Sequence, residues 1–400
     1  MRIFIAGMDG YLGWPLAQHL AVRGHVVAGA DLFLRRQWVK ELGSHSATPI
    51  ASMKDRLAAL RELGGLEPEF WEIDLTDYAS VERIFREFQP DAVAHLGECP
   101  SAPYSMIDVQ HATFVQVNNV VSTFNLLFAM RDHRPNAHLL KLGTMGEYGT
   151  PNLDIPEGFF EVEYRGRRDR LPFPRQPGSF YHLSKVHGSN NIMLACKLWK
   201  LRATDVMQGV VFGTRIEEIG DEDRLLTRLD FDECFGTVIN RFCCQAVIGH
   251  PLTPYGHGHQ KRGFLPLRDS IQCLTLALEN PPDAGEYRVF NQFQDVYDVT
   301  ELAFKVQRVA DRLGCRVEVQ NLENPRQEME EHYYRPDHQK LLDLGYVPTR
   351  DLEGELAVML ADLMKCRQRI EAKKALLIPS IQWSGKLQKV GYIDELAPTK

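Results

Sequence analysis

The strongest chemical signal in the chain is a tyrosine and a lysine four residues apart, Tyr181 and Lys185. On a helix these positions share one face, so the ammonium group can lie near the phenol. A nearby positive charge lowers the pKa of a phenol, and the phenolate can then accept a hydroxyl proton as hydride leaves. Thr144, just beyond a predicted strand, is expected to open onto the same crevice. Together the three residues predict an alcohol-oxidising site.

A glycine-rich turn near the N-terminus is predicted to bind the pyrophosphate of a dinucleotide. Gly7, Gly10 and Gly13 are spaced G-x-x-G-x-x-G between a predicted strand and a predicted helix. Glycine permits the tight turn, and the helix N-terminus favours an anion. Asp9, Tyr11 and Leu12 lie in the same turn and are expected to contact the cofactor.

Asp31 ends the next predicted strand, where a carboxylate can accept hydrogen bonds from both ribose hydroxyls of NAD and would repel the 2′-phosphate of NADP. Arg35 and Arg36 follow closely; a cofactor contact and a solvated surface pair both fit them, and the solvated pair is favoured. Asp74 fits either an adenine contact or a helix N-cap. The remaining predicted cofactor contacts lie at or near strand ends: Leu75, Leu96, Gly97, Glu98 and Gln208.

These side chains must be positioned by strands that alternate with helices, which predicts a Rossmann-type α/β fold with a doubly wound parallel sheet. The expected strands are 2–6, 26–30, 70–73, 92–96, 139–142 and 202–206, and the expected helices are 12–23, 78–88, 114–131 and 181–198. We expect an NAD-binding domain over residues 1–210 and a smaller, discontinuous nucleotide-sugar domain over 211–400. Residues 35–65 and 150–178 are expected to be long excursions, and about the last 15 residues a loosely held tail.

The composition is that of a globular protein, with 400 residues, 44% hydrophobic and 25% charged. A net charge of −7 and a pI near 6.1 argue against a nucleic-acid partner. We find no apolar run of the roughly 18–20 residues that cross a membrane. The eight cysteines are scattered without a C-x-x-C pair, and no signal peptide is recognised, so a cytoplasmic location is expected.

The glycine turn, Thr144 and Tyr181-x-x-x-Lys185, in this order, resemble the extended short-chain dehydrogenase/reductase superfamily, the NAD-dependent epimerases and dehydratases. The resemblance implies that Tyr181 is the acid/base, that Lys185 positions the nicotinamide ribose, and that Thr144 binds the substrate hydroxyl. It also implies that Asn118 contacts the cofactor.

A narrower resemblance covers nearly the whole chain. The runs 9–14, 101–108, 141–152, 180–187, 235–243 and 330–334 are similar to the UDP-sulfoquinovose synthase family. That family converts UDP-glucose and sulfite through C4 oxidation, loss of the 6-hydroxyl, sulfite addition at C6 and return of the hydride. The resemblance implies tightly bound NAD and a UDP-hexose substrate.

Two positions bear on the reaction. The family has Gln-Arg where this chain has Cys99-Pro100, and proline offers neither charge nor donor to an anionic sulfur species. His182, if protonated, could partly replace that arginine. Sugar 4,6-dehydratases place Asp-Glu directly after the threonine, whereas this chain has Met145-Gly146, with Glu147 one place later.

Arginine forks suit diphosphates, and the resemblance places Arg262 and Arg326 against the sugar diphosphate. Further substrate contacts are expected from residues on both sides of the crevice: Ser101, Thr144, Met145, Gly146, Glu147, His182, Gln208, Asn240, Arg241, Tyr255, Gln260 and His332. Residues 331–333 have the composition of metal ligands, but no second cluster accompanies them, so we expect no metal.

Three other functions stay open at this stage. A 4-epimerase needs the same three catalytic residues and no sulfite, so it is favoured by Cys99-Pro100. A simple NAD(P)H oxidoreductase would release its cofactor in each turnover, and a silent NAD-binding protein would have no activity. The family resemblance also implies a homodimer built on the helices around 114–131 and 181–198.

Overall fold

The computed structural model describes residues 1–328 and 333–393. Its centre is a seven-stranded sheet in the order β11-β8-β5-β4-β1-β2-β3, and every pairing in it is parallel. The strands are β1 (Arg2–Ala6), β2 (Val26–Asp31), β3 (Glu69–Glu72), β4 (Ala92–His95), β5 (His138–Thr144), β8 (Arg202–Gln208) and β11 (Tyr287–Gln292). The strand order reverses between β1 and β4, which opens a crevice at their carboxyl ends. The predicted doubly wound fold is confirmed.

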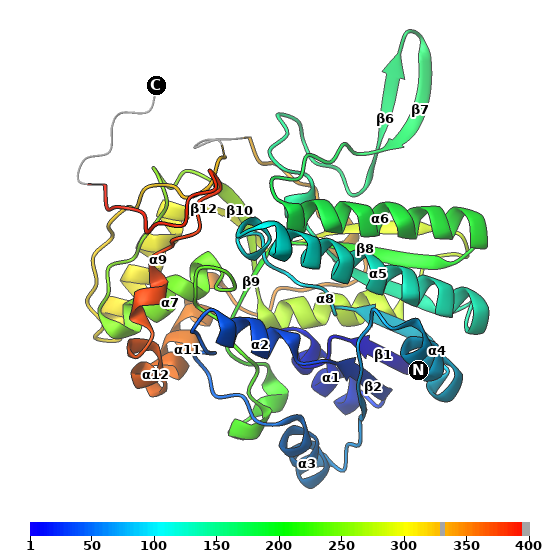
Figure 1. Cartoon of the computed structure of the whole chain (residues 1–400), viewed down its shortest axis with the longest axis horizontal. Coiled ribbons are helices and arrows are strands. Elements are labelled where there is room, and N and C mark those ends of the chain that lie inside the picture. The colour runs from blue at the N-terminus through cyan, green and yellow to red at the C-terminus, as the bar shows by residue number, and fades with distance from the viewer. Residues whose placement is uncertain (329–332, 394–400) are drawn as a thin grey trace.

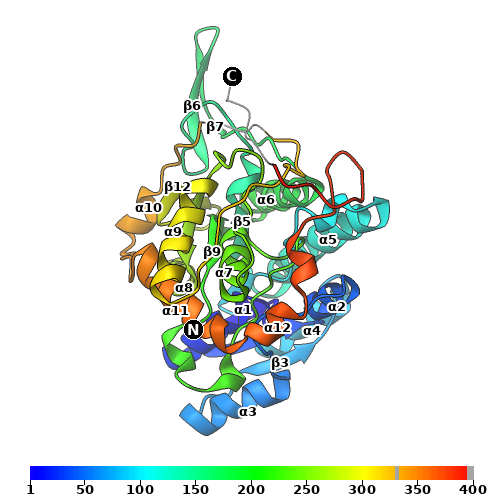
Figure 2. The same cartoon turned by 90° about the vertical axis from the view of Figure 1, so that its left-hand side faces the viewer.

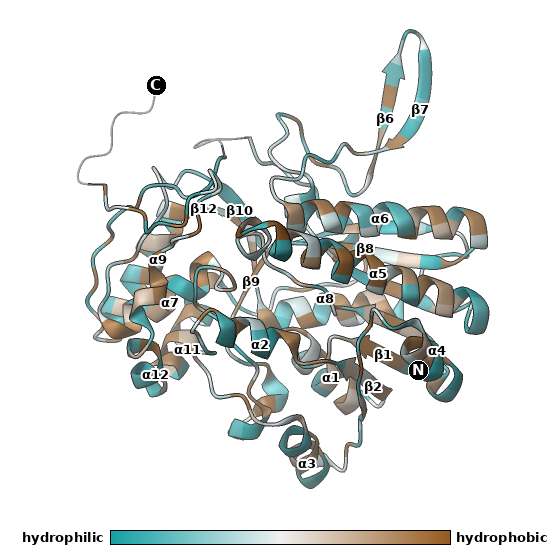
Figure 3. Cartoon of the chain, in the orientation of Figure 1, coloured by the Kyte–Doolittle hydropathy of each residue, from teal (hydrophilic) through white to brown (hydrophobic). Residues whose placement is uncertain are grey.

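Helices cover both faces of this sheet (Figure 1). On one face α1 (Gly13–Val22) and α8 (Leu267–Glu279) share a core with the strands. On the other lie α4 (Tyr78–Phe88), α5 (Val109–His133) and α6 (Phe180–Trp199), with α5 and α6 side by side. The inner strands are apolar along their length, as the brown of β1 and β2 shows (Figure 3). Strands buried on both faces are typical of such sheets.

The second half builds a smaller unit with its own core. A three-stranded sheet of β9 (Val210–Phe212), β10 (Lys261–Pro266) and β12 (Asp295–Asp298) packs with four helices: α7 (Val238–Ile248), α9 (Val299–Arg312), α11 (Leu352–Lys365) and α12 (Arg367–Glu371). Short helices complete the chain: α10 (Gln339–Asp343), η1 (Tyr104–Met106), η2 (Met145–Glu147), η3 (Glu217–Ile219), η4 (Asp223–Leu225) and η5 (Lys374–Leu377). Although α8 and β11 lie after residue 210, they belong to the larger sheet.

Both long excursions contain regular structure that the sequence analysis did not assign. Residues 35–65 include α2 (Leu34–Glu41) and α3 (Met53–Gly64). The start and end of α3 carry ordinary signals, a Ser52 N-cap that accepts from the backbone of Asp55 and a left-handed Gly65. Residues 150–178 include the hairpin β6 (Phe159–Tyr164) and β7 (Arg167–Pro172), which projects from the body in both views (Figures 1 and 2).

The segment expected to be a loose tail is bound to the protein as far as Ile393. Val390 is buried, and the backbone of Gly391 and Ile393 donates to Glu323 and Asn321. Residues 394–400 lie outside the described part of the chain.

Candidate active site

A cavity of about 570 Å³ lies at the carboxyl ends of the strands and extends to the second unit. It brings together most of the side chains that the sequence singles out. From the sheet side come Gly7, Gly10, Tyr11, Leu12, Gly13, Asp31, Arg35, Asp74, Leu75, Leu96, Gly97, Glu98, Asn118, Thr144, Met145, Gly146, Tyr181, His182, Lys185 and Gln208. From the other side come Asn240, Arg241, Tyr255, Gln260, Arg262 and Arg326. His332 lies outside the described residues.

The glycine turn lines the cavity with backbone atoms rather than with side chains. A Cβ on Gly7, whose φ is +91°, would lie 2.6 Å from the backbone nitrogen of Gly97. A Cβ on Gly13 would lie 2.1 Å from the carbonyl oxygen of Gly7. Side chains are thus excluded where α1 begins, and an anion can approach its N-terminus. The residues fit the pyrophosphate of a dinucleotide.

Asp31 lies at the end of β2 on the cavity wall. Its carboxylate accepts the backbone N–H of Asp9 at 2.9 Å and of Phe33 at 2.7 Å. Burial, and then the charge of Asp9, raise the pKa of Asp31 to about 6. Ribose hydroxyls would donate to the ionised form, so this carboxylate fits the adenosine ribose of NAD.

Neither Arg35 nor Arg36 forms the solvated pair that was favoured. Arg36 is paired with Asp9 at 2.6 Å, and Arg35 with Asp230 at 2.8 Å. These two arginines are thus engaged by carboxylates rather than directed to a 2′-phosphate. Asp9 and Arg36 also do not line the cavity, because the carboxylate of Asp9 turns inward to bind Arg56 at 2.8 Å.

Buried ion pairs join this region to a loop of the second unit. Arg228 pairs with Asp230 at 2.9 Å, so Asp230 binds both Arg228 and Arg35. The guanidinium of Arg35 also stacks on the ring of Phe235, 3.7 Å from its centre. The loop 226–236 is thereby fastened against α2.

Asp74 lines the cavity and accepts from the backbone and hydroxyl of Thr76, both at 2.8 Å. The N-cap of α4 is Asp77, not Asp74. Of the two interpretations, the position on the cavity wall leaves Asp74 available to an adenine. Asn118 also lines the cavity and donates to Asn119 at 2.9 Å.

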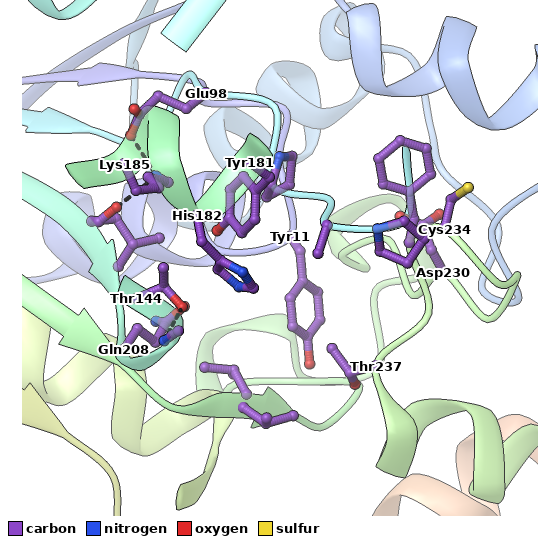
Figure 4. A pocket seen from close by; sticks show the side chains of 18 of the residues that line it. Tyr11, Glu98, Thr144, Tyr181, His182, Lys185, Gln208, Asp230, Cys234 and Thr237 are labelled. Carbon is purple, nitrogen blue, oxygen red and sulfur yellow. Dashed lines mark hydrogen bonds and ion pairs between the residues drawn. The ribbon is translucent and has the colours of Figure 1, made fainter. Parts of the chain in front are cut away.

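Tyr181, Lys185 and Thr144 face one another across the cavity (Figure 4). Ser179 is the N-cap of α6, two residues before Tyr181. The Tyr181 ring centre lies 5.9 Å from Lys185 Nζ. Thr144 ends β5, and its hydroxyl accepts the backbone N–H of Gly146 at 3.2 Å.

The pKa of Tyr181 is raised above its ordinary value, where the sequence predicted that Lys185 would lower it. Burial is the largest cause, and the charge of Glu98 is the next. Lys185 donates to Glu98 at 2.5 Å, so the negative carboxylate offsets the effect of the ammonium group on the phenol.

His182 lies beside Gly146, where a Cβ would come within 2.3 Å of its Nε2. Its Nδ1 is hydrogen-bonded to Ser179 at 2.9 Å. Burial, and then the charges of Arg326 and Arg262, lower the pKa of His182 to about 3. The imidazole is therefore neutral near pH 7 and cannot replace the missing arginine as a cation.

Two predicted substrate contacts point away from the cavity. Glu147 is fully buried between Lys141 at 3.1 Å and Arg175 at 2.8 Å. Ser101 donates to the carbonyl oxygen of Cys234 at 2.5 Å. Neither residue lines the cavity, so both contribute to the packing behind its walls.

The far end of the cavity is basic. Arg241 donates to the hydroxyl of Tyr255, and burial together with Arg326 lowers its pKa to about 9. Arg262 forms an ion pair with Glu328 at 2.7 Å. Arg241, Arg262 and Arg326 all line the cavity, and their guanidinium groups fit a diphosphate.

Comparison with known proteins agrees with this geometry. A model described as the NAD dependent epimerase/dehydratase family matches residues 3–291. The chain belongs to the NAD-dependent epimerase/dehydratase family.

Within this family the chain is 46% identical over 382 residues to a chloroplastic UDP-sulfoquinovose synthase of Spinacia oleracea, covering 96% of this chain and 79% of that protein. It is also 46% identical over 384 residues to a UDP-sulfoquinovose synthase of Sulfolobus acidocaldarius, covering 96% and 98%. A UDP-glucuronic acid 4-epimerase from Bacillus cereus, solved with UDP-glucuronic acid and NAD, has the same fold, with a TM-score of 0.67, 20% identity and coverage of 91% and 99%. The sequence resemblance is confirmed.

The chain is thus an NAD-dependent enzyme of the epimerase/dehydratase family, and the glycine turn and Asp31 are the residues that fit this cofactor. In the described part of the chain we found no helix long and apolar enough to cross a membrane. The described residues also contain no group of three or more His, Cys, Asp or Glu side chains suited to a metal ion.

The sequence analysis missed Trp383 and Glu233, which both line the cavity of this family member. The Glu233 carboxylate accepts the backbone of Ser380 and Ile381, at 2.5 and 2.9 Å, and so ties the C-terminal segment to the loop 226–236. Trp383 then lies under the guanidinium of Arg326, 5.5 Å from the ring centre. A lone tryptophan far from any motif gives no signal that it belongs to a site.

Cofactor retention is expected to depend on the ionisation of Asp31. Because its pKa in the folded protein is about 6, above the ordinary 3.8, folding favours the protonated form and NAD binding favours the ionised one. NAD retention should therefore fall as the pH drops below about 6. Asp31→Asn should retain little NAD at pH 8 and show no such transition. Gel filtration at several pH values, with NAD measured in the protein peak, tests this; a variant with the wild-type profile would contradict it.

Proposed function

We propose that this enzyme oxidises C4 of a UDP-hexose of the glucose type with NAD that stays bound, and then eliminates the 6-hydroxyl. One observation carries the proposal: the neutral imidazole of His182 lies beside Gly146, in the cavity that Thr144, Met145 and Tyr181 also line. The 46% identity to two UDP-sulfoquinovose synthases supports the same type of reaction.

Oxidation at C4 uses Thr144, which ends β5, and Tyr181, in the first turn of α6. Bound NAD supplies the hydride acceptor for C4–H. The hydroxyl of Thr144 can hydrogen-bond O4, and Tyr181 is the group in reach that exchanges the O4 proton. Both residues lie at the carboxyl edge of the sheet, near the end of β5. Their hydroxyl groups would therefore orient the sugar at this edge.

Elimination needs a base for the C5 proton, which a C4 ketone makes acidic. Met145-Gly146 supplies none, and Glu147 is buried in ion pairs. His182 is neutral near pH 7, so it can accept the C5 proton, and the absence of a side chain at Gly146 makes room for the ring. The C6–O bond then breaks, the protonated imidazole of His182 gives its proton to the departing oxygen, and a C5–C6 alkene and water result.

Incubation with UDP-glucose in deuterated water, with and without sulfite, tests this proposal. We expect deuterium at C5 of recovered sugar in the absence of sulfite, read by mass spectrometry and NMR. A sulfonated product in the presence of sulfite would identify sulfite as the nucleophile. Turnover of UDP-glucose without any deuterium at C5 would overturn the elimination step.

A 4-epimerase is the second candidate, and it is favoured by a specific feature. Pro100 lines the cavity at the position of the family arginine, and the neutral His182 supplies no cation in its place. An epimerase would give an isomer of unchanged mass that carries no deuterium. A simple oxidoreductase would differ from both candidates because NAD would not remain bound to the purified protein.

We also propose a homodimer through α5 and α6. Both helices expose apolar side chains, among them Val117, Phe124, Phe128, Leu194 and Leu198. Exposed apolar faces on two adjacent helices favour a four-helix contact. Sedimentation of wild type should give a dimer, and a monomer at all concentrations would contradict it.

The eight free cysteines support a reducing compartment, and we propose the cytoplasm.

A further inference from the structure

The last part of the described chain, residues 378–393, contacts both halves of the protein, and we call it the C-terminal segment. Ile381 is buried in the cluster that contains Tyr104 and Tyr181, on the sheet side of the cavity. Toward the second unit, Tyr392 forms a backbone bridge with Leu322. In Figure 2 the segment is drawn in red and rises from α12 past the end of α5. The segment therefore connects the two units beside the cavity.

This segment places Trp383 in the cavity wall. The backbone N–H of Trp383 donates to the carbonyl oxygen of Pro325 at 2.8 Å, and the guanidinium carbon of the next residue, Arg326, lies 5.5 Å from the indole ring centre. A Cβ on Gly178, two residues before α6, would lie 3.9 Å from Cζ3 of the indole. Trp383, Arg326 and Gly178 all line the cavity. The indole thus lies between the start of the catalytic helix and the guanidinium group.

Arg326 differs from its neighbour Arg262 in how its charge is engaged. Arg262 forms an ion pair with Glu328 at 2.7 Å, whereas no carboxylate within residues 1–328 and 333–393 forms an ion pair with Arg326. A guanidinium group that stacks on an aromatic ring keeps the N–H donors at its edge available, and these donors match phosphate oxygens. Trp383 therefore supports the Arg326 side chain without using its donors.

The C-terminal segment is itself fastened by one side chain of the cavity wall. The carboxylate of Glu233 accepts the backbone N–H groups of Ser380 and Ile381 at 2.5 and 2.9 Å, and it also accepts the Ser380 hydroxyl at 2.7 Å. Glu233 lines the cavity that the arginines also line. A carboxylate there opposes the binding of an anion, but its three hydrogen bonds determine where the segment lies.

We propose that the C-terminal segment completes the nucleotide-sugar site, with Trp383 holding the Arg326 guanidinium toward the diphosphate and covering the link between the diphosphate and the sugar. Trp383 is then a positioning residue for Arg326, and Glu233 is a positioning residue for the segment. The inference rests on the proposed UDP-hexose substrate and adds to its site a part of the chain that carries none of the catalytic motifs.

Binding of UDP to the NAD-loaded protein, measured by isothermal titration calorimetry, tests this without turnover. In Trp383→Ala the dissociation constant should rise about 5- to 30-fold, because a cation–π contact in a closed site is lost. The NAD content should equal that of wild type. Trp383→Phe keeps an aromatic ring and should recover most of the affinity.

A double-mutant cycle shows whether Trp383 acts through Arg326. Arg326→Gln should also weaken UDP binding, because a phosphate contact is lost. Once Arg326 is replaced, the further change Trp383→Ala should have little effect on UDP affinity. Fully additive losses would show that the two residues act independently and would contradict the positioning role.

Glu233→Ala gives a test in which the sign of the effect decides. If the carboxylate acted only by its charge, its removal would strengthen the binding of UDP. If it holds the segment in place, UDP affinity should fall as it does in Trp383→Ala. The control is Trp71→Ala, which removes a partly buried tryptophan of β3 that contacts the ring of Phe88 outside the cavity and should leave UDP affinity unchanged.

Unchanged UDP affinity in Trp383→Ala, stronger binding in Glu233→Ala, or an equal loss in Trp71→Ala would each overturn the proposal. The outcome is separate from that of the proposed reaction. If UDP binding depends on Trp383 but UDP-glucose gains no deuterium at C5, the elimination fails and this inference stands. Deuterium at C5 together with unchanged UDP affinity in Trp383→Ala would remove this inference alone.

Discussion

Tyr181→Phe is expected to abolish oxidation at C4 while NAD remains in the protein. The phenol is the group placed to exchange the O4 proton, and general acid–base groups contribute about 10²–10⁴-fold to the rate. The ring packs in a cluster with Cys99, Trp38 and Phe235, and phenylalanine retains that packing. Reduction of bound NAD after mixing with UDP-glucose, followed at 340 nm, measures the step.

Cofactor content provides the internal control for this variant. Equal NAD in wild type and Tyr181→Phe, together with an unchanged thermal unfolding midpoint, would confine the loss to proton transfer. Reduction of NAD at the wild-type rate would show that Tyr181 is not the acid/base and would remove the basis of the proposed function.

His182→Asn should leave NAD reduction by UDP-glucose intact and stop deuterium incorporation at C5. A general base is lost, so we expect a decrease of roughly 10²–10⁴-fold in exchange. Asparagine retains a polar group that can bond Ser179, which now binds His182 Nδ1 at 2.9 Å. Bound NADH should then accumulate, because the sugar is oxidised but cannot proceed.

The matched control is His187, five residues beyond His182 on the same helix, which hydrogen-bonds Gln116 at 3.2 Å. His187→Asn should retain wild-type exchange at C5. If His182→Asn also exchanged at the wild-type rate, elimination through His182 would be refuted and the 4-epimerase would become the better description.

The catalytic residues could be predicted because their signals are local. Tyr181 and Lys185 are one helical turn apart, and Thr144 ends a strand, so helix periodicity and the strand-end rule bring them together. The pairing of Lys185 with Glu98 joins residues 87 positions apart, and no local pattern contains it. The expected lowering of the Tyr181 pKa is not found, because burial, and then the charge of Glu98, raise it.

Burial explains the other differences between sequence and structure. Glu147 is close to Thr144 in sequence, but the turn η2 directs it toward Lys141 and Arg175, whose positions depend on tertiary packing. The neutral state of His182 likewise depends on burial, and then on the charges of Arg326 and Arg262, which come from the second half of the chain. By contrast, α3 was missed although its capping residues were present in the sequence.

The ion pairs that join α2 and α3 to the glycine turn and to the loop 226–236 have a consequence for how the enzyme responds to the cell. Arg35, Arg36 and Arg56 are anchored to Asp230 and Asp9 beside the predicted adenosine end of the cavity. Opening that end would leave buried charges without partners, which is costly. A cofactor that seldom leaves does not equilibrate with the free NAD⁺/NADH pool. Turnover should therefore be insensitive to the cellular NAD⁺/NADH ratio, and an assay with excess free NADH should give the same rate as one without it.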